Sequence, residues 1–269
     1  MSSPHRNRHG SFIKFSRFKA LKVSLAWIVA PSCPHIATNI FKKTYKQRHV
    51  FVNVKASVLP ESLIKIARDY FDDARPTHDW DHVERVHNLC LHIGRVEGAD
   101  LEVLSCAAYL HDIGRGFEER DISVCHARKG AQLAQGLLAD MGFEDTFIQK
   151  VVHCIATHRF RDGLMPGTLE ARVLYDADKL DAIGAIGIAR AYAYAGEHNQ
   201  RLVEEFEREH GDDLSVDHTS HSPIKEYKVK LSKIKARMLT TEGRRIAEKR
   251  DAFMRAFLER LRAECEGVI

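Results

Sequence analysis

The sequence predicts an all-α protein folded as a compact, irregular bundle of helices. From Pro60 onward, apolar residues recur at intervals of three and four, which is the spacing of one helix face. No segment shows the strict alternation of apolar and polar residues that is typical of a half-buried strand. We find no internal repeat and no heptad array, so a single irregular bundle is the expected architecture.

The first half of this bundle is predicted to contain three amphipathic helices with recognisable stops. Their apolar stripes lie, in order, at 63–71 before Pro76, at 83–96 before Gly98, and at 100–114, ending near Gly114. The stripe of the third helix runs through Leu104, Ala107 and Ala108 to His111. The end of that helix is therefore expected to deliver a histidine from the core into a central cavity.

The second half is predicted to continue in the same way. Helices are expected over 126–141, over 147–158, over Leu169–Gly196 as one long helix, and over 224–239 and 241–264. Within the long helix, the small residues Gly184, Ala185 and Gly187 suggest close packing against a neighbour. The polar segment 197–222 is expected to be a loop or a frayed helix.

Charge divides the 269 residues into a leader and a body. Residues 1–60 hold 11 Lys or Arg and no Asp or Glu, so the rest of the chain holds 30 basic and 37 acidic residues. We expect a basic leader over 1–55, disordered or targeting, and a helical catalytic domain over 56–269, with its core at about 61–195 and C-terminal helices at about 224–264. A transit peptide would place the protein in an organelle such as the mitochondrion, and otherwise it is expected in the cytoplasm.

Composition also limits the binding partners and the environments that the protein is expected to have. An acidic body argues against nucleic acid, because phosphate-backbone binding needs clustered basic residues. The apolar stretch Val23–Ala30 is well short of the ~20 residues that cross a bilayer, so no membrane span is expected. The six cysteines form no CxxC pair and are interpreted as reduced thiols. Cys90, Cys106 and Cys154 lie among apolar residues and are expected to be buried.

Histidine is the residue type that most needs an explanation. The chain has 16, and several fall on or beside apolar helix faces. Two His-Asp dipeptides occur, His78-Asp79 and His111-Asp112. The second continues an apolar stripe, whereas the first precedes a helix near Pro76 and is expected to be exposed.

Five segments, taken together, resemble the HD-domain phosphohydrolases in their order along the chain. They are HDWDHVERV (78–86), AAYLHDIG (107–114), CHARKGAQLA (125–134), ATH (156–158) and DADKLDAIGAIGIAR (176–190). The resemblance covers about 61–195, and TTEGRRIAEKRDAFMRAFLERL (240–261) is similar to the tail of a bacterial and fungal branch that includes nucleotide pyrophosphohydrolases. It implies the HD-domain fold and a divalent metal held by a histidine, the His-Asp pair and a distant aspartate.

Carried onto this sequence, the resemblance implies His82, His111, Asp112 and Asp178 as the metal ligands. His78 is the rival of His82, and Asp176 and Asp181 are the rivals of Asp178. On a helix Asp176 lies about 200° from Asp178, whereas Asp181 shares a face with it. We therefore expect Asp181 to orient a ligand.

Further residues are expected around this metal. Asp112 is placed in the catalytic set, with His126 and His158 as phosphate-binding or proton-transferring groups in preference to ligands of a second metal. Arg85 is expected to act in catalysis, and Arg115 and Lys129 are expected to bind phosphate.

Two other kinds of charged residue lie near these positions in the sequence. Lys179 is expected to form a salt bridge. Glu118 and Glu119 could supply an acid or base, although a solvated loop is the preferred interpretation.

The predicted function is metal-dependent hydrolysis of a phosphoester or phosphoanhydride bond by a metal-activated water, with a nucleotide as the favoured substrate. Two imidazoles and two carboxylates suit Mn²⁺ first, with Mg²⁺, Co²⁺, Ni²⁺ and Fe²⁺ as alternatives. A non-catalytic module that senses a nucleotide or metal, and a cyclic-nucleotide phosphodiesterase, are the competing hypotheses. The C-terminal helices are expected to form scaffold or the surface of a homodimer.

Overall fold

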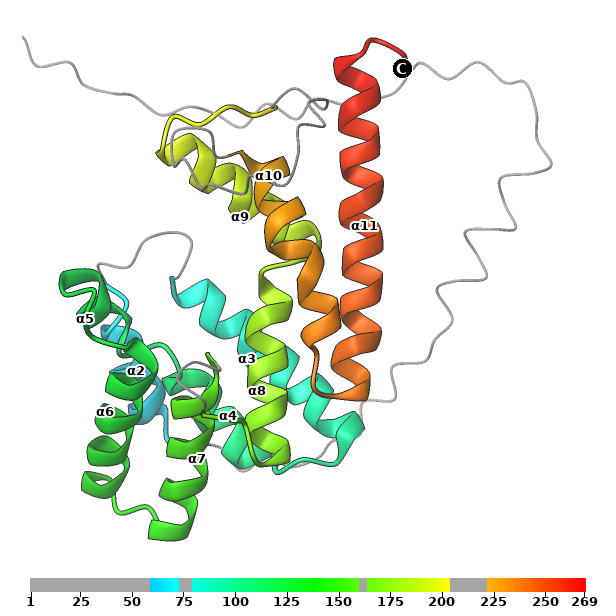
Figure 1. The fold of residues 1–269 in the computed structure, drawn as a ribbon. Coiled ribbons are helices and arrows are strands. Elements are labelled where there is room, and N and C mark those ends of the chain that lie inside the picture. The colour runs from blue at the N-terminus through cyan, green and yellow to red at the C-terminus, as the bar shows by residue number, and fades with distance from the viewer. Residues whose placement is uncertain (1–58, 73–78, 160–163, 204–221) are drawn as a thin grey trace, which may run out of the picture. The chain divides into compact units, whose positions relative to one another are not determined.

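The computed structural model describes residues 59–72, 79–159, 164–203 and 222–269, and these residues contain helices and no strand (Figure 1). The prediction of an all-α fold is therefore confirmed. The leader, Cys33 and His78 lie outside the described residues. Among the described helices, none combines the length and the apolar character that crossing a membrane requires.

The first three helices follow the predicted stripes: α2 (Glu61–Asp69), α3 (Trp80–Glu97) and α4 (Leu101–Leu110). Asp79 caps α3, because its side chain accepts a hydrogen bond from the backbone N–H of His82. Gly98 ends α3 in the left-handed conformation, with φ at 80°, which glycine adopts without a steric penalty. Asp100 caps α4 in the same manner as Asp79 caps α3.

The next three helices are α5 (Arg115–Arg120), α6 (His126–Asp140) and α7 (Asp145–Thr157). The loop expected around Glu118 and Glu119 is wrong, because both residues belong to α5, although Glu119 is exposed to solvent as expected. A Cβ at Gly114 would overlap the carbonyl oxygen of His126 and the backbone of Gly130. Glycine at this position therefore lets the turn after the His-Asp pair pack directly on the start of α6.

The long helix expected over Leu169–Gly196 is two helices, α8 (Leu169–Asp181) and α9 (Gly184–Glu197). Gly184 starts α9 with φ at 82°, a left-handed conformation that no helix interior contains. A Cβ at Gly187 would overlap the carbonyl oxygen of Ala182, so this glycine also permits the sharp corner. The apolar pattern runs across this corner without interruption, which is why periodicity alone predicts one helix.

The C-terminal part comprises α10 (Pro223–Val229), the 3₁₀ helix η2 (Leu231–Arg237) and α11 (Thr241–Cys265). The single helix expected over 224–239 is therefore two short ones. Asp176 fastens this part to α8, because its carboxylate accepts hydrogen bonds from the backbone N–H groups of Leu239 and Thr240 and from the Thr240 hydroxyl.

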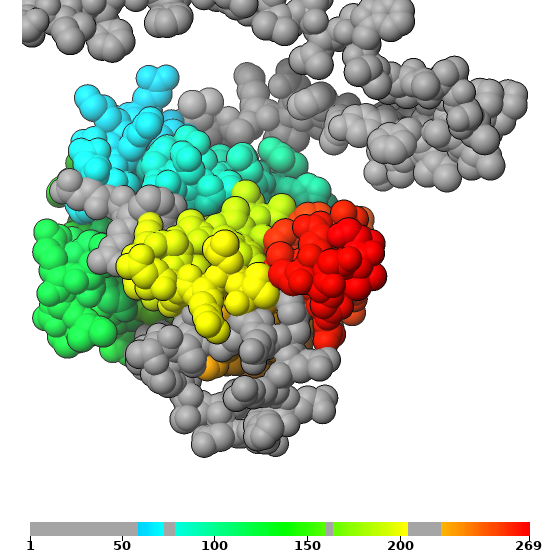
Figure 2. All heavy atoms as spheres, turned by 90° about the horizontal axis from the view of Figure 1, so that it is seen from above, coloured from blue at the N-terminus to red at the C-terminus, as the bar shows by residue number. Residues whose placement is uncertain are grey.

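The core forms where α3 packs on α4 and α8, and where α7 packs on α4, α6 and α8. In Figure 1, α5, α6 and α7 lie to the left of α8 and α11 to its right, whereas α9 and α10 lie above α8. Figure 2 shows α9, in yellow, beside the end of α11, in red, in agreement with their contacts. Cys90, Cys106 and Cys154 are buried and unpaired, as predicted.

Candidate metal centre

Helix ends bring together in the core six side chains that could ligate a metal. His82 lies in the first turn of α3 and His126 opens α6, whereas His111 and His158 follow the last residues of α4 and α7. Asp112 comes directly after His111, and Asp178 lies in the last turn of α8. The four histidines and Asp112 are each at most 1% exposed. Such burial of polar side chains is costly unless they are paired or bind a ligand.

The first ligand group consists of His82, His111 and Asp178, whose ligand atoms lie within 4.8 Å of one another. The Nε2 atoms of His82 and His111 are 3.3 Å apart, and His82 Nε2 is 3.5 Å from Asp178 Oδ1. Three of the four predicted ligands therefore converge on one point.

The second ligand group consists of Asp112, His126 and His158, which also lie within 4.8 Å of one another. Asp112 Oδ1 is 3.2 Å from His126 Nε2 and 3.6 Å from His158 Nε2. The other oxygen, Oδ2, is 3.8 Å from His82 Nε2 and 3.7 Å from His111 Nε2. Asp112 thus stands between the two groups. The second group also has the donors of a further metal site, whereas the sequence favours phosphate binding or proton transfer for His126 and His158.

The tautomer of each histidine follows from its partner at Nδ1. His111 and His158 donate from Nδ1 to the carbonyl oxygens of Ala108 and Ile155, at 2.7 and 2.6 Å. Carbonyl oxygens only accept hydrogen bonds, so the proton of a neutral imidazole must be at Nδ1.

His82 and His126 meet the same condition through carboxylates. His82 Nδ1 is 2.8 Å from Asp181 Oδ2, and His126 Nδ1 hydrogen-bonds Glu118. All four imidazoles are consequently oriented with the Nε2 lone pair directed into the cluster, as metal-binding histidines are.

Burial and charge set the protonation states. Burial lowers the pKa of both His111 and His126 to about 4, so these imidazoles are neutral near pH 7. For Asp112, burial alone would raise the pKa, but the positive charge of Arg115 holds it well below its usual range. Burial likewise opposes ionisation of Asp178, and the positive charge of Lys179 holds the pKa of that carboxyl well below its usual range. Neutral imidazoles and ionised carboxylates are the forms that bind a divalent cation.

Three aspartates on α8 have three different roles. Asp178 belongs to the first ligand group, and Asp181 holds the far side of His82 while it accepts hydrogen bonds from Arg85 and Arg190. Asp176 faces away and anchors the C-terminal part. The helix geometry that separated Asp176 from the other two in the sequence matches this arrangement.

The predicted cationic residues are distributed around the carboxylates. Arg115 binds both oxygens of Asp112, with its Nε 2.8 Å from Oδ2, and Lys179 pairs with Asp178 at 2.6 Å. Arg85 binds Asp181, which in turn contacts His82 of the first ligand group. Lys129 lies over the ring of Phe117, with its Nζ 5.0 Å from the ring centroid. Arg115 is therefore the predicted phosphate-binding residue that lies nearest to the centre of the cluster.

Sequence reasoning missed two arginines, Arg159 and Arg190, and gave Glu118 too little weight. Glu118 contacts His126 and receives a hydrogen bond from Arg159 at 2.5 Å. Arg159 directly follows His158, and this adjacency was the available signal. Glu118 gave no comparable signal, because α5 is too short to show an apolar stripe.

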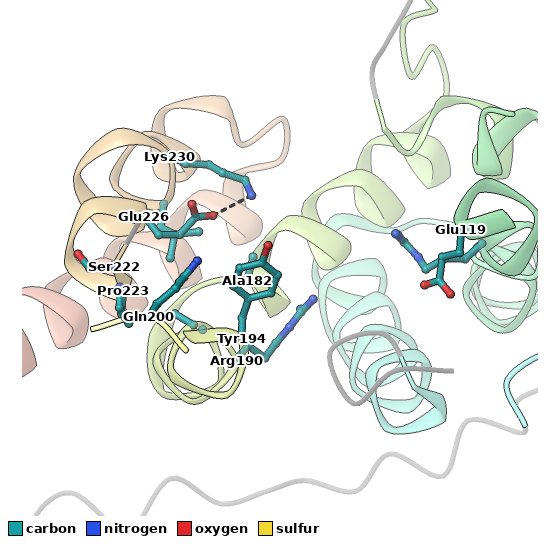
Figure 3. A pocket seen from close by; sticks show the side chains of 13 residues that line it. Glu119, Ala182, Arg190, Tyr194, Gln200, Ser222, Pro223, Glu226 and Lys230 are labelled. Carbon is teal, nitrogen blue, oxygen red and sulfur yellow. Dashed lines mark hydrogen bonds and ion pairs between the residues drawn. The ribbon is translucent and has the colours of Figure 1, made fainter. Parts of the chain in front are cut away.

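A cavity of about 430 Å³ adjoins the cluster (Figure 3). Arg115 lines the cavity and also contacts Asp112, while Arg190 lines it and contacts Asp181. The cavity continues between α9 and α10, where Tyr194 and Glu226 are among the lining residues. A ligand there would touch cationic groups next to the candidate metal ligands.

The donor set fits a divalent metal. Each group offers two neutral imidazole nitrogens and a carboxylate oxygen, a mixed set that suits transition metals such as Mn²⁺, Fe²⁺, Co²⁺ or Ni²⁺. The Nε2 atoms of His82 and His111 are 3.3 Å apart, and those of His126 and His158 are 3.2 Å apart. Because each ring carries its proton on Nδ1, neither pair has a hydrogen between its Nε2 atoms. A bound cation would balance that repulsion between lone pairs.

Comparison with known proteins gives the same assignment. The model of the HD domain family matches residues 79–183. YpgQ of Bacillus subtilis, an uncharacterized protein, is 33% identical over 202 residues, which are 73% of this chain and 88% of YpgQ. A crystal structure of YpgQ in complex with ADP has a TM-score of 0.58 and 29% identity, covering 76% of this chain and 93% of YpgQ.

A second solved structure comes from an uncultured Thermotogales bacterium and is described as a predicted HD superfamily hydrolase. It has a TM-score of 0.55 and 32% identity, and covers 76% of this chain and 92% of its own. The matched family model includes the His-Asp pair and all the candidate ligands. With the helical fold and the buried His/Asp cluster, these likenesses show that the chain belongs to the HD superfamily of hydrolases.

Proposed function

We propose that this chain is a metal-dependent phosphohydrolase that cleaves a phosphoester or phosphoanhydride bond in a nucleotide. The observation that carries the proposal is the set of four imidazoles, each donating from Nδ1 to an acceptor oxygen, whose Nε2 atoms surround the two oxygens of Asp112. A divalent cation bound there would lower the pKa of a water molecule and offset negative charge on the phosphoryl group.

The chain's own residues would prepare the reaction. His82, His111, Asp112 and Asp178 would hold the cation, with Asp181 fixing the orientation of His82. Either His126 and His158 hold a further cation with Asp112, or they bind phosphate and accept a proton at Nε2. Arg115 has side-chain nitrogens at the cluster and in the cavity wall, where they would offset charge that develops on phosphoryl oxygens.

Nucleotides are the substrate class that we favour. The YpgQ structure contains ADP, and YpgQ is 33% identical to this chain over most of its length. The narrower proposal is a nucleoside triphosphate pyrophosphohydrolase. Water would then attack the α-phosphorus, the bond to the bridging oxygen would break, and the products would be a nucleoside monophosphate and pyrophosphate. Mn²⁺ is the proposed metal because the site mixes nitrogen and oxygen ligands.

The test is a screen for phosphate and pyrophosphate release from nucleotides with Mn²⁺, Mg²⁺, Co²⁺ or Ni²⁺. The inactive variant is Asp178→Asn, and its matched control is Asp176→Asn, the same change two residues away on α8 outside both ligand groups. We expect turnover in wild type and in Asp176→Asn, and loss of at least ~100-fold in Asp178→Asn.

Two outcomes would contradict the proposal. Release that survives Asp178→Asn would exclude chemistry at this cluster. Metal and nucleotide binding without any release would instead favour the alternative of a sensing module that keeps the fold.

A further inference from the structure

The cavity of about 430 Å³ has two chemically different ends. Arg115 and Arg190 lie at the first end, and each contacts a carboxylate at the cluster: Arg115 binds Asp112 at 2.8 Å, and Arg190 binds Asp181 at 2.9 Å. In Figure 3, Arg190 extends from α9 toward the side of the cavity on which Glu119 of α5 lies. This end is cationic and lies beside the candidate metal ligands.

The second end lies between α9 and α10, where the lining residues are of a different kind. Tyr194 contributes an aromatic ring, Gln200 contributes an amide, and Glu226 and Lys230 form an ion pair at 2.8 Å (Figure 3). One face of the Tyr194 ring stacks on His198, with ring centroids 3.9 Å apart, and the residue is 42% exposed. The imidazole therefore supports the ring from one side and holds it in place as a stacking surface.

We infer that the part of the cavity between α9 and α10 receives the nucleoside portion of the substrate, with the base stacked near Tyr194 and the phosphates directed toward Arg115 and Arg190. The inference rests on the proposed function and deepens it. The volume falls within the ~300–1,000 Å³ of small-molecule sites. Phosphate alone would need only the cationic end, whereas an aromatic ring with an amide nearby suits a flat group that carries donors and acceptors.

The same geometry predicts a division between binding and chemistry. Tyr194 makes no contact with the ligand groups in the described structure, so its loss should weaken binding of the nucleoside without slowing the chemical step. Ala191 also lines the cavity and is small, so a large side chain there should fill the proposed nucleoside space.

The experiment compares Tyr194→Ala, Tyr194→Phe and Ala191→Trp with wild type, each in the full chain with Mn²⁺. For each protein, kcat and KM are measured with a nucleoside triphosphate, and inorganic tripolyphosphate serves as a nucleoside-free substrate or competitive inhibitor. Tyr194→Ala should raise the KM for the nucleotide about tenfold, in the range of base–aromatic stacking, with kcat within about twofold. Tyr194→Phe keeps the ring and should match wild type, and Ala191→Trp should raise the same KM.

Tripolyphosphate distinguishes the outcomes. Its KM or inhibition constant should be equal in all four proteins, because it has no base to stack. Equal changes for both compounds, or an unchanged nucleotide KM in both Tyr194→Ala and Ala191→Trp, would overturn the inference while leaving the proposed function intact. A wild-type protein that hydrolyses no nucleotide would instead overturn the proposed function, and with it this assignment.

Discussion

The two ligand groups are equally rich in histidine but are supported in different ways. The first group is held from inside the packed helices, because Asp181 of α8 orients His82 and is itself bound by Arg85 and Arg190. The second group depends on α5, a six-residue helix without a buried residue, whose Glu118 orients His126. The first site should therefore be rigid and the second adjustable, and among the candidate ligands that the structure describes Asp112 places one oxygen toward each group.

The largest expected effect tests that shared role of Asp112. Asp112→Asn keeps the shape but removes the charge and one oxygen, so metal binding should fall to background at both groups. Elemental analysis after dialysis against Mn²⁺ would measure the stoichiometry, and circular dichroism would check folding. Asp178→Asn is the control, because it belongs to the first group only. A wild-type metal content in Asp112→Asn would show that Asp112 joins neither group.

The next effect concerns the support of the first group. Asp181→Asn should weaken metal binding there by roughly 10–100-fold, as loss of a partner of a ligating histidine does. Asp176→Asn on the same helix should leave this affinity unchanged and instead lower stability by about 1–3 kcal/mol, because buried donors at Leu239 and Thr240 lose an acceptor. Calorimetric titration and thermal unfolding would separate the two effects. Equal losses of affinity in both variants would mean that Asp181 has no specific role.

The support of the second group should matter in the same way but to a smaller degree. Glu118 is half-buried, and the amide oxygen of a glutamine can still accept from His126 Nδ1, so Glu118→Gln should reduce the affinity of the second group by only about tenfold. Glu119→Gln is the matched control, since that carboxylate makes no contact with His126 in the described structure. The second step of a two-site titration is the measurement. A change in the first step instead would mean that the groups do not have separate supports.

The smallest effect uses a histidine outside both groups. His87 of α3 bonds Ser105 at 2.8 Å and stacks on Tyr109, and burial, assisted by Arg95, lowers its pKa to about 4. Below pH ~6.5 the unfolded chain binds a proton at His87 that the folded chain does not, so stability falls as pH falls from about 6.5 to 4. In metal-free protein, His87→Gln should lessen the fall in Tm over this range by roughly 2–4 °C. An identical pH profile would contradict this account of burial.

Sequence reasoning succeeded where function depends on the local pattern. Helical spacing placed Asp178 and Asp181 on one face and Asp176 away from it, and in the structure the first two lie at opposite nitrogens of His82, 3.5 and 2.8 Å away. The stripe that ends at His111 likewise predicted a histidine delivered from the core.

The features that escaped prediction depend on contacts between distant segments or on one backbone angle. Glu118, His126 and Arg159 meet only after α5, α6 and α7 have packed. The corner at Gly184 interrupts a pattern that is apolar on both sides, and only its positive φ reveals the break. The cavity beside the cluster also results from this corner, because α9 supplies Arg190 and Tyr194.

The corner at Gly184 also separates, along the sequence, the candidate metal ligands from most of the cavity wall. Every candidate metal ligand, from His82 to Asp178, precedes Gly184, whereas most of the cavity wall, from Gly187 to Leu231, follows it. An insertion or a replaced segment after residue 184 could therefore alter which molecule is accepted while leaving the reacting centre untouched. Such a change would have to preserve the contact by which Arg190 of α9 returns to Asp181, where its Nη1 lies 2.9 Å from Oδ2.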